Sequence, residues 1–480
     1  MSKRKIIIIG AGLAGSLLAI YLARRDFEVE IYERRPDMRT TEISAGRSIN
    51  LALSNRGIAA LREVGMDEYM LREAVPMHGR MIHPVSGDMR LLPYSGRKGE
   101  YINSVSRAGL NIALINEAEK YESVNFIFNR GCMVCAPESS TAILLDPVTN
   151  KGLSVSGDTL IATDGAGSVV RNFFGPAPDF QFSSEFLDHR YVELSIPAGP
   201  EGSFLIEKNA LHIWPRHKFM MIALPNLDGS FTVTLFLAAK GENSFESIFS
   251  SDWHNEDHWA SFNAASIDEK GFRKWQHPLQ PFAWERLKSF FEENFPDALA
   301  IMPTLEEDFF SHPVGELGTV KCFPWNIGGK ALLLGDAAHA VVPFYGQGMN
   351  CAFEDCRVLA SLIDKHGPDW ETVYGQYGDL RKINTDAIAD MAVENFYEMR
   401  DAVADPVFVR KRELETKLEQ TYSDYFSKYS MVTFREDLPY SVAKAKGNTQ
   451  DRLLMDICAG VANVDELDLG DVIEKIRALS

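Results

Sequence analysis

The chain has 480 residues, of which 45% are hydrophobic and 24% charged, and its formal net charge at pH 7 is −18. This length exceeds what one hydrophobic core normally organises, so two or three domains are expected. The acidic balance argues against a nucleic acid or an anionic membrane as the main partner. Six cysteines in so long a chain do not make a disulfide scaffold, and they favour a reducing, cytoplasmic location.

The N-terminal segment predicts a βαβ unit. Residues 5–9 form an uninterrupted apolar run, as in a parallel strand that is covered on both faces. Residues 13–24 then favour a helix, and residues 28–32 favour a second strand. The next predicted elements are a helix over 51–75 that Gly65 interrupts, strands over 81–83 and 101–105, and a helix over 110–121.

The second half changes character twice. Short alternating strands over roughly 173–240, separated by turn residues, predict an antiparallel sheet. Residues 241–297 are polar and aromatic-rich and favour helices with insertions. The α/β pattern returns near Lys330, and nearly everything after Asp379 reads as helix. No run of 18 apolar residues occurs, so no membrane-spanning helix is expected.

We therefore expect an α/β fold class in which a Rossmann-like nucleotide-binding domain is interrupted by an antiparallel β-rich substrate domain and closed by a helical C-terminal region. The expected boundaries are 1–75, 106–172 and 298–378 for the nucleotide-binding domain, 76–105 and 173–297 for the substrate domain, and 379–480 for the helical region.

A glycine motif lies directly between the first strand and the first helix. Gly10, Gly12 and Gly15 form a G-x-G-x-x-G, and Glu33 follows 18 residues later at the end of the second strand. In this context the glycines allow a tight turn and close approach to a pyrophosphate, and the acid can bind ribose hydroxyls. The motif indicates a dinucleotide but does not separate NAD from FAD.

The stretch 332–355, LLLGDAAHAVVPFYGQGMNCAFED, favours a flavin. It reads as a buried strand, then Gly335-Asp336, then a Pro/Gly-rich loop, then a helix that opens near Met349. Asp336 suits the hydroxyls of a sugar-like chain. Gly346 and Gly348 let the backbone approach a flat ligand at a helix N-terminus, where free N–H groups favour the negative charge of a reduced flavin.

A further segment, 162–171, reads ATDGAGSVVR after an apolar strand. With the glycine motif and the Gly335-Asp336 pair, it makes the chain resemble the single-component flavin-dependent aromatic hydroxylases over most of its length. Ala162 stands where that family usually has glycine. The alternatives for Ser168 and Arg171 are a helix cap and a surface ion pair.

The resemblance implies that FAD is bound and that NADPH is the co-substrate. The residues alone leave NADPH and NADH open, because the reductant has no separate fingerprint here. By position, Arg107 resembles the family's arginine that reaches the FAD phosphates; the alternative is a solvated arginine at a helix start. The implied cofactor-binding residues are Gly10, Gly12, Leu13, Ala14, Gly15, Glu33, Arg34, Ala52, Arg107, Asp164, Asp336, Gly348, Met349 and Asn350.

Four longer strings, at 46–54, 211–216, 220–226 and 429–434, are similar to one group within this family, whose substrate is an aniline ketone with an amino-acid tail. The chain is similar to that group's soluble bacterial type, which has no C-terminal membrane anchor. The resemblance implies that Arg80 clamps the substrate carboxylate. Tyr94, Asn395, Tyr429 and Glu398 are implied at the polar end, with Phe236, Met220, Leu224 and Phe344 as candidates for the ring slot.

The implied reaction is an NADPH- and O₂-dependent ring hydroxylation through a flavin C4a-hydroperoxide, with no protein residue assigned as a general base. One alternative is a flavin hydroxylase of another aromatic acid, and another is a non-catalytic flavin redox sensor. The role of Tyr345 is open. We interpret His339 as satisfying local hydrogen bonds and Cys132 and Cys135 as ordinary strand cysteines, since no zinc-like second pair follows them.

Overall fold

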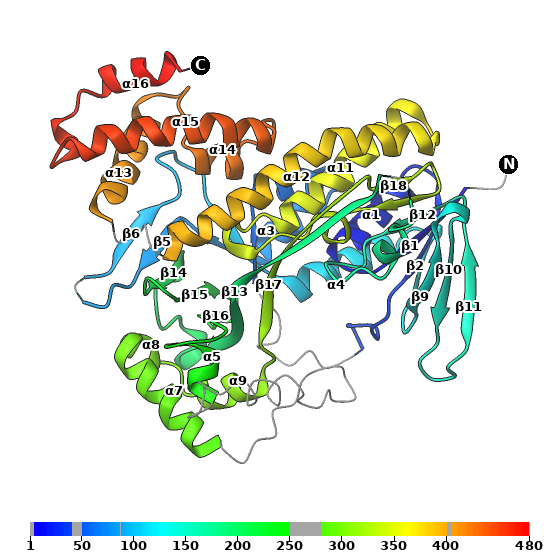
Figure 1. Ribbon diagram of the computed structural model, residues 1–480, viewed down its shortest axis with the longest axis horizontal. Coiled ribbons are helices and arrows are strands. Elements are labelled where there is room, and N and C mark those ends of the chain that lie inside the picture. The colour runs from blue at the N-terminus through cyan, green and yellow to red at the C-terminus, as the bar shows by residue number, and fades with distance from the viewer. Residues whose placement is uncertain are drawn as a thin grey trace.

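The computed structural model describes residues 4–40, 50–86, 88–177, 179–249, 280–400 and 405–479. Two large sheets organise the chain, with a helical region at its C-terminal end (Figure 1). Residues 46–49 of the first similar string, and residues 250–279 of the segment expected to be helical with insertions, lie outside the described residues.

The first sheet is the predicted nucleotide-binding core. Its six strands lie in the order β18-β19-β12-β1-β2-β8, and β1 pairs in parallel with β2 and β12. Covered on both faces, β1 needs apolar side chains throughout, which explains its isoleucine run. The strands are β1 (Lys5–Ile9), β2 (Glu28–Tyr32), β8 (Val124–Ile127), β12 (Thr159–Ala162), β18 (Asn326–Ile327) and β19 (Ala331–Leu333); the helices packed around it include α1 (Leu13–Ala23), α4 (Arg107–Ala118) and α11 (Gly348–His366).

The second sheet has seven strands in the order β17-β13-β16-β15-β14-β5-β6, and only the β14–β5 pair is parallel. It is the predicted antiparallel, β-rich unit. Its strands are β5 (Gly79–Ile82), β6 (Arg90–Pro93), β13 (Gln181–Ile196), β14 (Ala210–Pro215), β15 (Met220–Pro225), β16 (Phe231–Ala238) and β17 (Gly315–Phe323). One face packs on α5 (Phe245–Phe249), α7 (Gln280–Asn294), α8 (Pro296–Leu299) and α9 (Leu305–Ser311), below the sheet in Figure 1.

The opposite face of this sheet packs against the C-terminal region. Its apolar side chains join those of the short turn η4 (Pro343–Tyr345) and of the long helix α12 in one cluster. Four further helices complete the region at the upper left of Figure 1. The helices are α12 (Trp370–Arg400), α13 (Pro406–Thr421), α14 (Lys428–Phe434), α15 (Tyr440–Ala459) and α16 (Leu469–Arg477).

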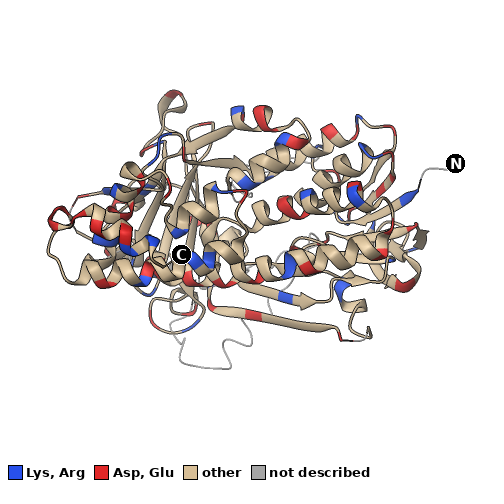
Figure 2. Cartoon of the chain, turned by 90° about the horizontal axis from the view of Figure 1, so that it is seen from above, with Lys and Arg blue, Asp and Glu red and all other residues tan. Residues whose placement is uncertain are grey.

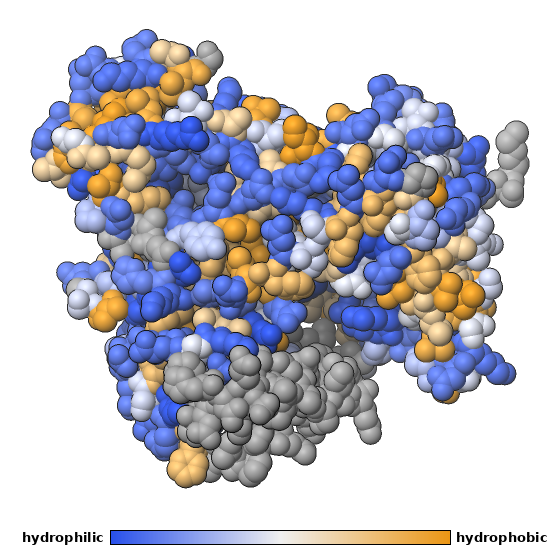
Figure 3. Space-filling model, viewed as in Figure 1, coloured by the Kyte–Doolittle hydropathy of each residue, from blue (hydrophilic) through white to orange (hydrophobic). Residues whose placement is uncertain are grey.

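Two small sheets and three short helices fill the remaining chain. The antiparallel sheet β11-β10-β9 lies at the right of Figure 1, where Figure 3 shows apolar surface. Met133, Ile143 and Leu153 of this sheet are exposed. The bounds of these elements are β3 (Asn50–Leu53), β4 (Ala74–Met77), β7 (Ile102–Ser106), β9 (Gly131–Ala136), β10 (Thr141–Leu145), β11 (Gly152–Ser156), α2 (Asn55–Glu63), α3 (Asp67–Arg72) and α10 (Asp336–His339).

Three sequence predictions need correction. The helix expected over 51–75 is β3, α2, α3 and β4 in succession, because β7 pairs with β3 on one side and β4 on the other. The expected run of short strands includes one strand of 16 residues, β13. The long helix α12 begins at Trp370 rather than after Asp379. In addition, β17 falls in the segment expected to belong to the nucleotide-binding domain, yet it pairs with β13.

Lys and Arg residues are interspersed with Asp and Glu residues along the helices seen from above (Figure 2). Among the described residues, no helix combines the length and the apolar character needed to cross a bilayer.

Candidate active site

The glycine motif forms a turn that only glycine fits at two of its three positions. Gly10 has a φ of +104°, and a Cβ there would lie 2.6 Å from the Thr163 carbonyl oxygen. A Cβ on Gly15 would lie 2.1 Å from the Gly10 carbonyl oxygen. Gly12 differs, because a Cβ there meets nothing within 4 Å. The space in front of Gly12, at the N-terminus of α1, is therefore open for a ligand.

Glu33 is buried at the end of β2 and is held toward this turn. Its carboxylate accepts hydrogen bonds from the backbone N–H of Ala11 at 3.0 Å and from that of Arg35 at 3.0 Å. The same oxygen that bonds the Arg35 N–H also accepts from the Arg35 side chain at 3.0 Å, whereas the oxygen that bonds Ala11 retains a lone pair that can accept from a ribose hydroxyl. Arg34, also predicted to bind the cofactor, is exposed beside it.

The segment 162–171, here called the D-G segment after Asp164-Gly165, is joined by a hydrogen bond from Arg171 to the segment that begins with Gly335-Asp336. The Asp164 carboxylate accepts from the Ser168 hydroxyl at 2.5 Å and from the Val169 backbone N–H at 2.8 Å. Burial raises the pKa of Asp164 despite these bonds. Arg171 donates to the carbonyls of Ala337, at 2.8 Å, and Ala166, at 2.6 Å.

Two open alternatives are thereby resolved. The Ser168 hydroxyl accepts from the Arg171 backbone N–H at 3.0 Å, a cap-like contact, although the residue directly before the short 3-10 helix Val170–Phe173 is Val169. Arg171 is not part of a surface ion pair: its side chain is buried and donates to two carbonyl oxygens. Asp336, the first residue of α10, is exposed.

Asn350 fixes the predicted flavin-binding turn. Its side-chain amide donates to the carbonyls of Ala52 and Gly346, each at 2.8 Å, and its oxygen accepts from the Ser54 backbone N–H at 2.9 Å. Gly346 has a φ of +67°. The N-terminus of α11 is thus locked to β3, while Gly348 and Met349 occupy the first helical positions.

These residues fit FAD. Besides the open space at Gly12, the Oδ1 of Asn111 is buried and makes no hydrogen bond within the described part of the chain, although the same amide donates to the Ala11 carbonyl at 3.0 Å. A ligand hydroxyl can satisfy that oxygen. Arg107 lies at the exposed start of α4, one turn before Asn111. The remaining predicted residues, Leu13 and Ala14, open α1.

The polar end of the predicted substrate site is built around a buried arginine. Arg80, on β5, is 7% exposed, and its guanidinium lies 3.4 Å from the Glu398 carboxylate of α12. Burial lowers the pKa of Arg80, but the nearby Tyr429, Glu398 and Tyr94 outweigh it and leave the pKa above its usual value. The Nε of Arg80 and the hydroxyl of Tyr94 are both buried, and neither has a hydrogen-bond partner among the described residues. A bound carboxylate would satisfy both groups.

Three tyrosines stack beside this arginine. The ring of Tyr429 lies parallel to Tyr94, with centroids 5.2 Å apart, and parallel to Tyr345 at 5.6 Å. The Arg80 guanidinium lies 5.1 Å from the Tyr429 ring centroid. Burial raises the pKa of all three hydroxyls, so they remain neutral donors. The stack assigns Tyr345, whose role the sequence left open, to the wall of this site.

Asn395 lies in the same region but its amide is engaged elsewhere. It donates to the Phe344 carbonyl oxygen at 2.6 Å and so holds the turn η4 against α12. In the structure Asn395 therefore fixes the backbone of Phe344, a residue of the predicted ring slot.

The four ring-slot candidates divide between two clusters. Met220, Phe236 and Phe344 lie together, with the rings of Phe236 and Phe344 at 4.9 Å. Leu224 belongs to a neighbouring cluster with Tyr94, and Tyr429 borders both clusters. The polar end and the apolar slot are thus contiguous through Tyr429.

His339 is satisfied locally, in agreement with the sequence interpretation. Its Nε2 lies 2.6 Å from the buried carboxylate of Asp355, which Arg381 also contacts at 2.7 Å. Burial opposes ionisation of Asp355, but His339 and Arg381 outweigh it and hold its pKa below the usual value. Cys351 completes a group with metal-like spacing. Because the Arg381 guanidinium already lies against both Asp355 and Cys351, a metal ion has no place there.

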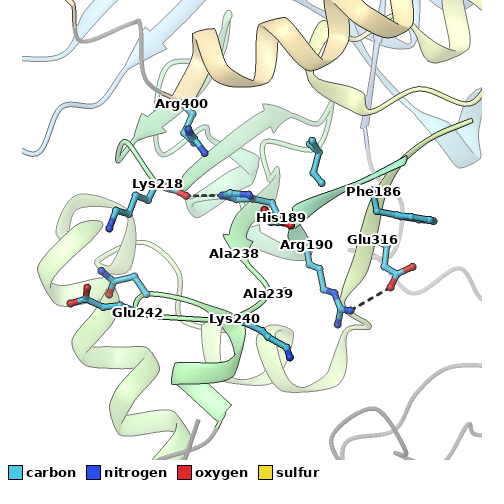
Figure 4. Close-up of a pocket in the computed structure, with 13 residues that line it drawn as sticks. Phe186, His189, Arg190, Lys218, Ala238, Ala239, Lys240, Glu242, Glu316 and Arg400 are labelled. Carbon is cyan, nitrogen blue, oxygen red and sulfur yellow. Dashed lines mark hydrogen bonds and ion pairs between the residues drawn. The ribbon is translucent and has the colours of Figure 1, made fainter. Parts of the chain in front are cut away.

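A cavity of about 650 Å³ opens near the predicted ring slot, between β13, β16 and the end of α12 (Figure 4). None of the predicted site residues lines it. Its His189 packs edge-on against Phe396, with ring centroids 4.9 Å apart, and Phe396 packs against Phe344 at 4.5 Å. The cavity is therefore separated from the ring slot by the Phe396 ring.

Comparisons with known proteins agree with this geometry. The family described as FAD binding domain matches residues 3–287 and 298–367. The chain is 44% identical over 477 residues to a kynurenine 3-monooxygenase from Myxococcus xanthus, covering 99% of this chain and 95% of the relative. It is 40% identical over 456 residues to one from Flavobacterium psychrophilum, covering 95% and 94%.

Solved structures show the same fold at low identity. The p-nitrophenol 4-monooxygenase from Pseudomonas putida superposes with a TM-score of 0.62 at 16% identity, covering 95% of this chain and 98% of that one. A 2-methyl-3-hydroxypyridine-5-carboxylic acid oxygenase variant gives 0.61 at 18% identity, covering 88% and 99%.

Proposed function

The chain belongs to the kynurenine 3-monooxygenase family of FAD-dependent monooxygenases, and on that basis we propose that it converts L-kynurenine to 3-hydroxy-L-kynurenine with NADPH and O₂. The observation that carries the substrate assignment is the pair of buried, unpartnered groups on Arg80 and Tyr94. They lie beside an apolar, aromatic-lined slot, as an aromatic amino acid requires.

The protein's part in the reaction is binding and orientation. FAD, reduced by NADPH, supplies the activated oxygen when it is bound. Arg80 Nε and the Tyr94 hydroxyl hold the substrate carboxylate, and the Glu398 carboxylate accepts from the substrate ammonium. Phe236, Met220 and Phe344 direct the ring toward the turn that Asn350 fixes.

Exclusion of water is the second task. The substrate-facing side chains of this region are almost entirely buried, with Phe236 at 2% and Phe344 at 7% exposure. A dry slot keeps the activated oxygen from being lost as peroxide before it reaches the ring.

The test uses purified protein carrying FAD. NADPH consumption and aromatic product are followed with L-kynurenine, with hydroxybenzoates and without any substrate. We expect L-kynurenine alone to stimulate NADPH oxidation and to yield the 3-hydroxylated product. Stimulation by a hydroxybenzoate instead would indicate a hydroxylase of another aromatic acid, and bound flavin without any substrate response would indicate a redox sensor.

A further inference from the structure

Arg56 connects the cofactor side of the site to the substrate side. It is the second residue of α2, and its side chain is completely buried although it is charged. A buried guanidinium persists only where its N–H groups and its charge are satisfied together. Arg56 meets that condition through contacts with three different elements.

The first group of contacts reaches α14 and the turn after it. The Nε of Arg56 donates to the Val432 carbonyl oxygen at 2.9 Å, and Nη2 donates to the Leu438 carbonyl oxygen. The neighbouring Asn55 donates to the Phe434 carbonyl oxygen at 3.0 Å. The start of α2 thus binds the C-terminal end of α14, the helix that carries Tyr429.

The second group reaches the flavin-binding helix. Nη1 of Arg56 lies 2.8 Å from the Glu354 carboxylate of α11, and the guanidinium lies 3.9 Å from the ring centroid of Tyr440. The Tyr440 hydroxyl donates to Gln347, the residue that precedes α11, at 2.9 Å. Two residues before Arg56, the Ser54 backbone N–H donates to Asn350.

From these contacts we propose that Arg56 is a positioning residue for the reaction. It sets the distance between the flavin-binding turn at Gly346–Asn350 and Tyr429, which contacts Arg80 and bounds the ring slot. Without it α14 and the turn after it each lose a hydrogen bond to α2, and the substrate ring would be held in the wrong place relative to bound FAD. The inference rests on the proposed function.

The informative variant is Arg56→Lys. A lysine keeps the positive charge opposite Glu354, but one ammonium on a flexible stem cannot reproduce the planar fork that reaches two carbonyls and stacks on Tyr440. We expect FAD affinity within about threefold of wild type. We expect the yield of hydroxylated product per NADPH consumed to fall at least about fivefold, with peroxide rising correspondingly, because the ring is misplaced while the cofactor is still reduced.

A spectroscopic readout separates positioning from general destabilisation. L-kynurenine added to the oxidised holoenzyme should perturb the flavin absorption of the wild type, and Arg56→Lys should show a smaller perturbation at saturating substrate. Arg216→Lys is the matched control. Arg216 is also a buried arginine that donates to carbonyls, those of Asn294 and His83, but it lies in the β-rich unit away from α14. It should lower thermal stability without changing product yield per NADPH.

If Arg56→Lys does not fold, Asn55→Ala decides the matter, because it removes the bond to Phe434 and leaves the buried charge intact. It should lower the product yield per NADPH in the same direction, by a smaller factor. If whichever of these two variants folds has the wild-type product yield per NADPH and the wild-type change in flavin absorption with L-kynurenine, the proposed role of Arg56 is overturned. A wild-type protein that does not respond to L-kynurenine would overturn the proposed function instead.

Discussion

At the scale of single residues, the three glycines of the first turn have separable roles. Gly10 and Gly15 are required by backbone contacts within the protein, whereas Gly12 faces open space. Gly12 also has an ordinary extended conformation, with a φ of −73°. An alanine there costs the apoprotein little, but its methyl group would occupy the space where the pyrophosphate approaches α1.

We therefore predict that Gly12→Ala leaves the thermal midpoint of the FAD-free protein unchanged and weakens FAD binding at least about tenfold, or ~1.4 kcal/mol. Flavin fluorescence titration measures the affinity, and differential scanning fluorimetry of the apoprotein measures stability. Gly15→Ala is the contrasting variant and should fail to accumulate as folded protein. Equal FAD affinity in Gly12→Ala and wild type would refute the placement of the pyrophosphate.

The buried arginine at the polar end leads to a second prediction at this scale. Arg80→Ala removes the charge-assisted hydrogen bond from Nε to the substrate carboxylate, and such a bond contributes about 1.5–3 kcal/mol. The KM for L-kynurenine should rise about 10- to 150-fold, while FAD content stays at the wild-type level because the contacts of the flavin-binding turn do not include Arg80. Tyr94→Phe, which removes only the unpartnered hydroxyl, should show a smaller rise. Unchanged affinity in Arg80→Ala would contradict the carboxylate clamp.

At the scale of elements, a chain of hydrogen bonds ties β5 and β14 to α8. The Nδ1 of His83 lies 2.7 Å from the Asp297 carboxylate, and its Nε2 lies 2.8 Å from Nδ1 of His212. The Nε2 of His212 lies 2.7 Å from the Glu207 carbonyl oxygen. Burial lowers the pKa of His212 to about 4, from an ordinary 6.5, although the bond to Glu207 opposes the shift.

This shift predicts a pH-dependent stability. The unfolded chain takes up the His212 proton near pH 6.5 and the folded protein only near pH 4, so the stabilising contribution is complete above pH 6.5 and is lost as the pH falls toward 4. The free energy of unfolding should decrease by about 3 kcal/mol across this interval. Urea titrations at successive pH values would measure the decrease.

His212→Gln should flatten the dependence, and His78→Gln, at an exposed position, should leave it as in wild type. A wild-type slope in His212→Gln would show that another group is responsible.

Some helices and strands could be predicted from the sequence alone, and others could not. The unit β1-α1-β2 was predictable because buried parallel strands and the glycine turn leave local signatures. The strands β3 and β4 were not, since their apolar spacing also suits a helix and only the pairing with β7 decides between the two. Individual site residues could be nominated from the resemblance, but the Tyr94–Tyr429–Tyr345 stack brings together three distant segments that no local pattern relates.

At the scale of the whole molecule, the proposed cofactor site joins three segments that lie far apart in the chain: the turn after β1, the segment after β12 and the N-terminus of α11. A ligand that binds only the folded protein stabilises it by mass action. FAD at 100 times its Kd should raise the stability of the apoprotein by about 2.7 kcal/mol.

Denaturant unfolding of the apoprotein with and without added FAD measures this gain. Gly12→Ala at the same FAD concentration is the control and should gain much less. An identical unfolding midpoint with and without FAD would show that the site is not formed by the folded arrangement described above.

The strand order of the six-stranded sheet also bears on how the chain folds during synthesis. The outer edge of β12 pairs with β19, yet β12 ends at Ala162 and β19 begins at Ala331. At 5–20 residues per second, a ribosome needs on the order of ten seconds or more to make the intervening chain. During that interval β12, three of whose four residues are apolar, has one open edge, and an open strand edge is a template for intermolecular pairing. We therefore expect the nascent chain to be prone to association at that edge until β19 emerges.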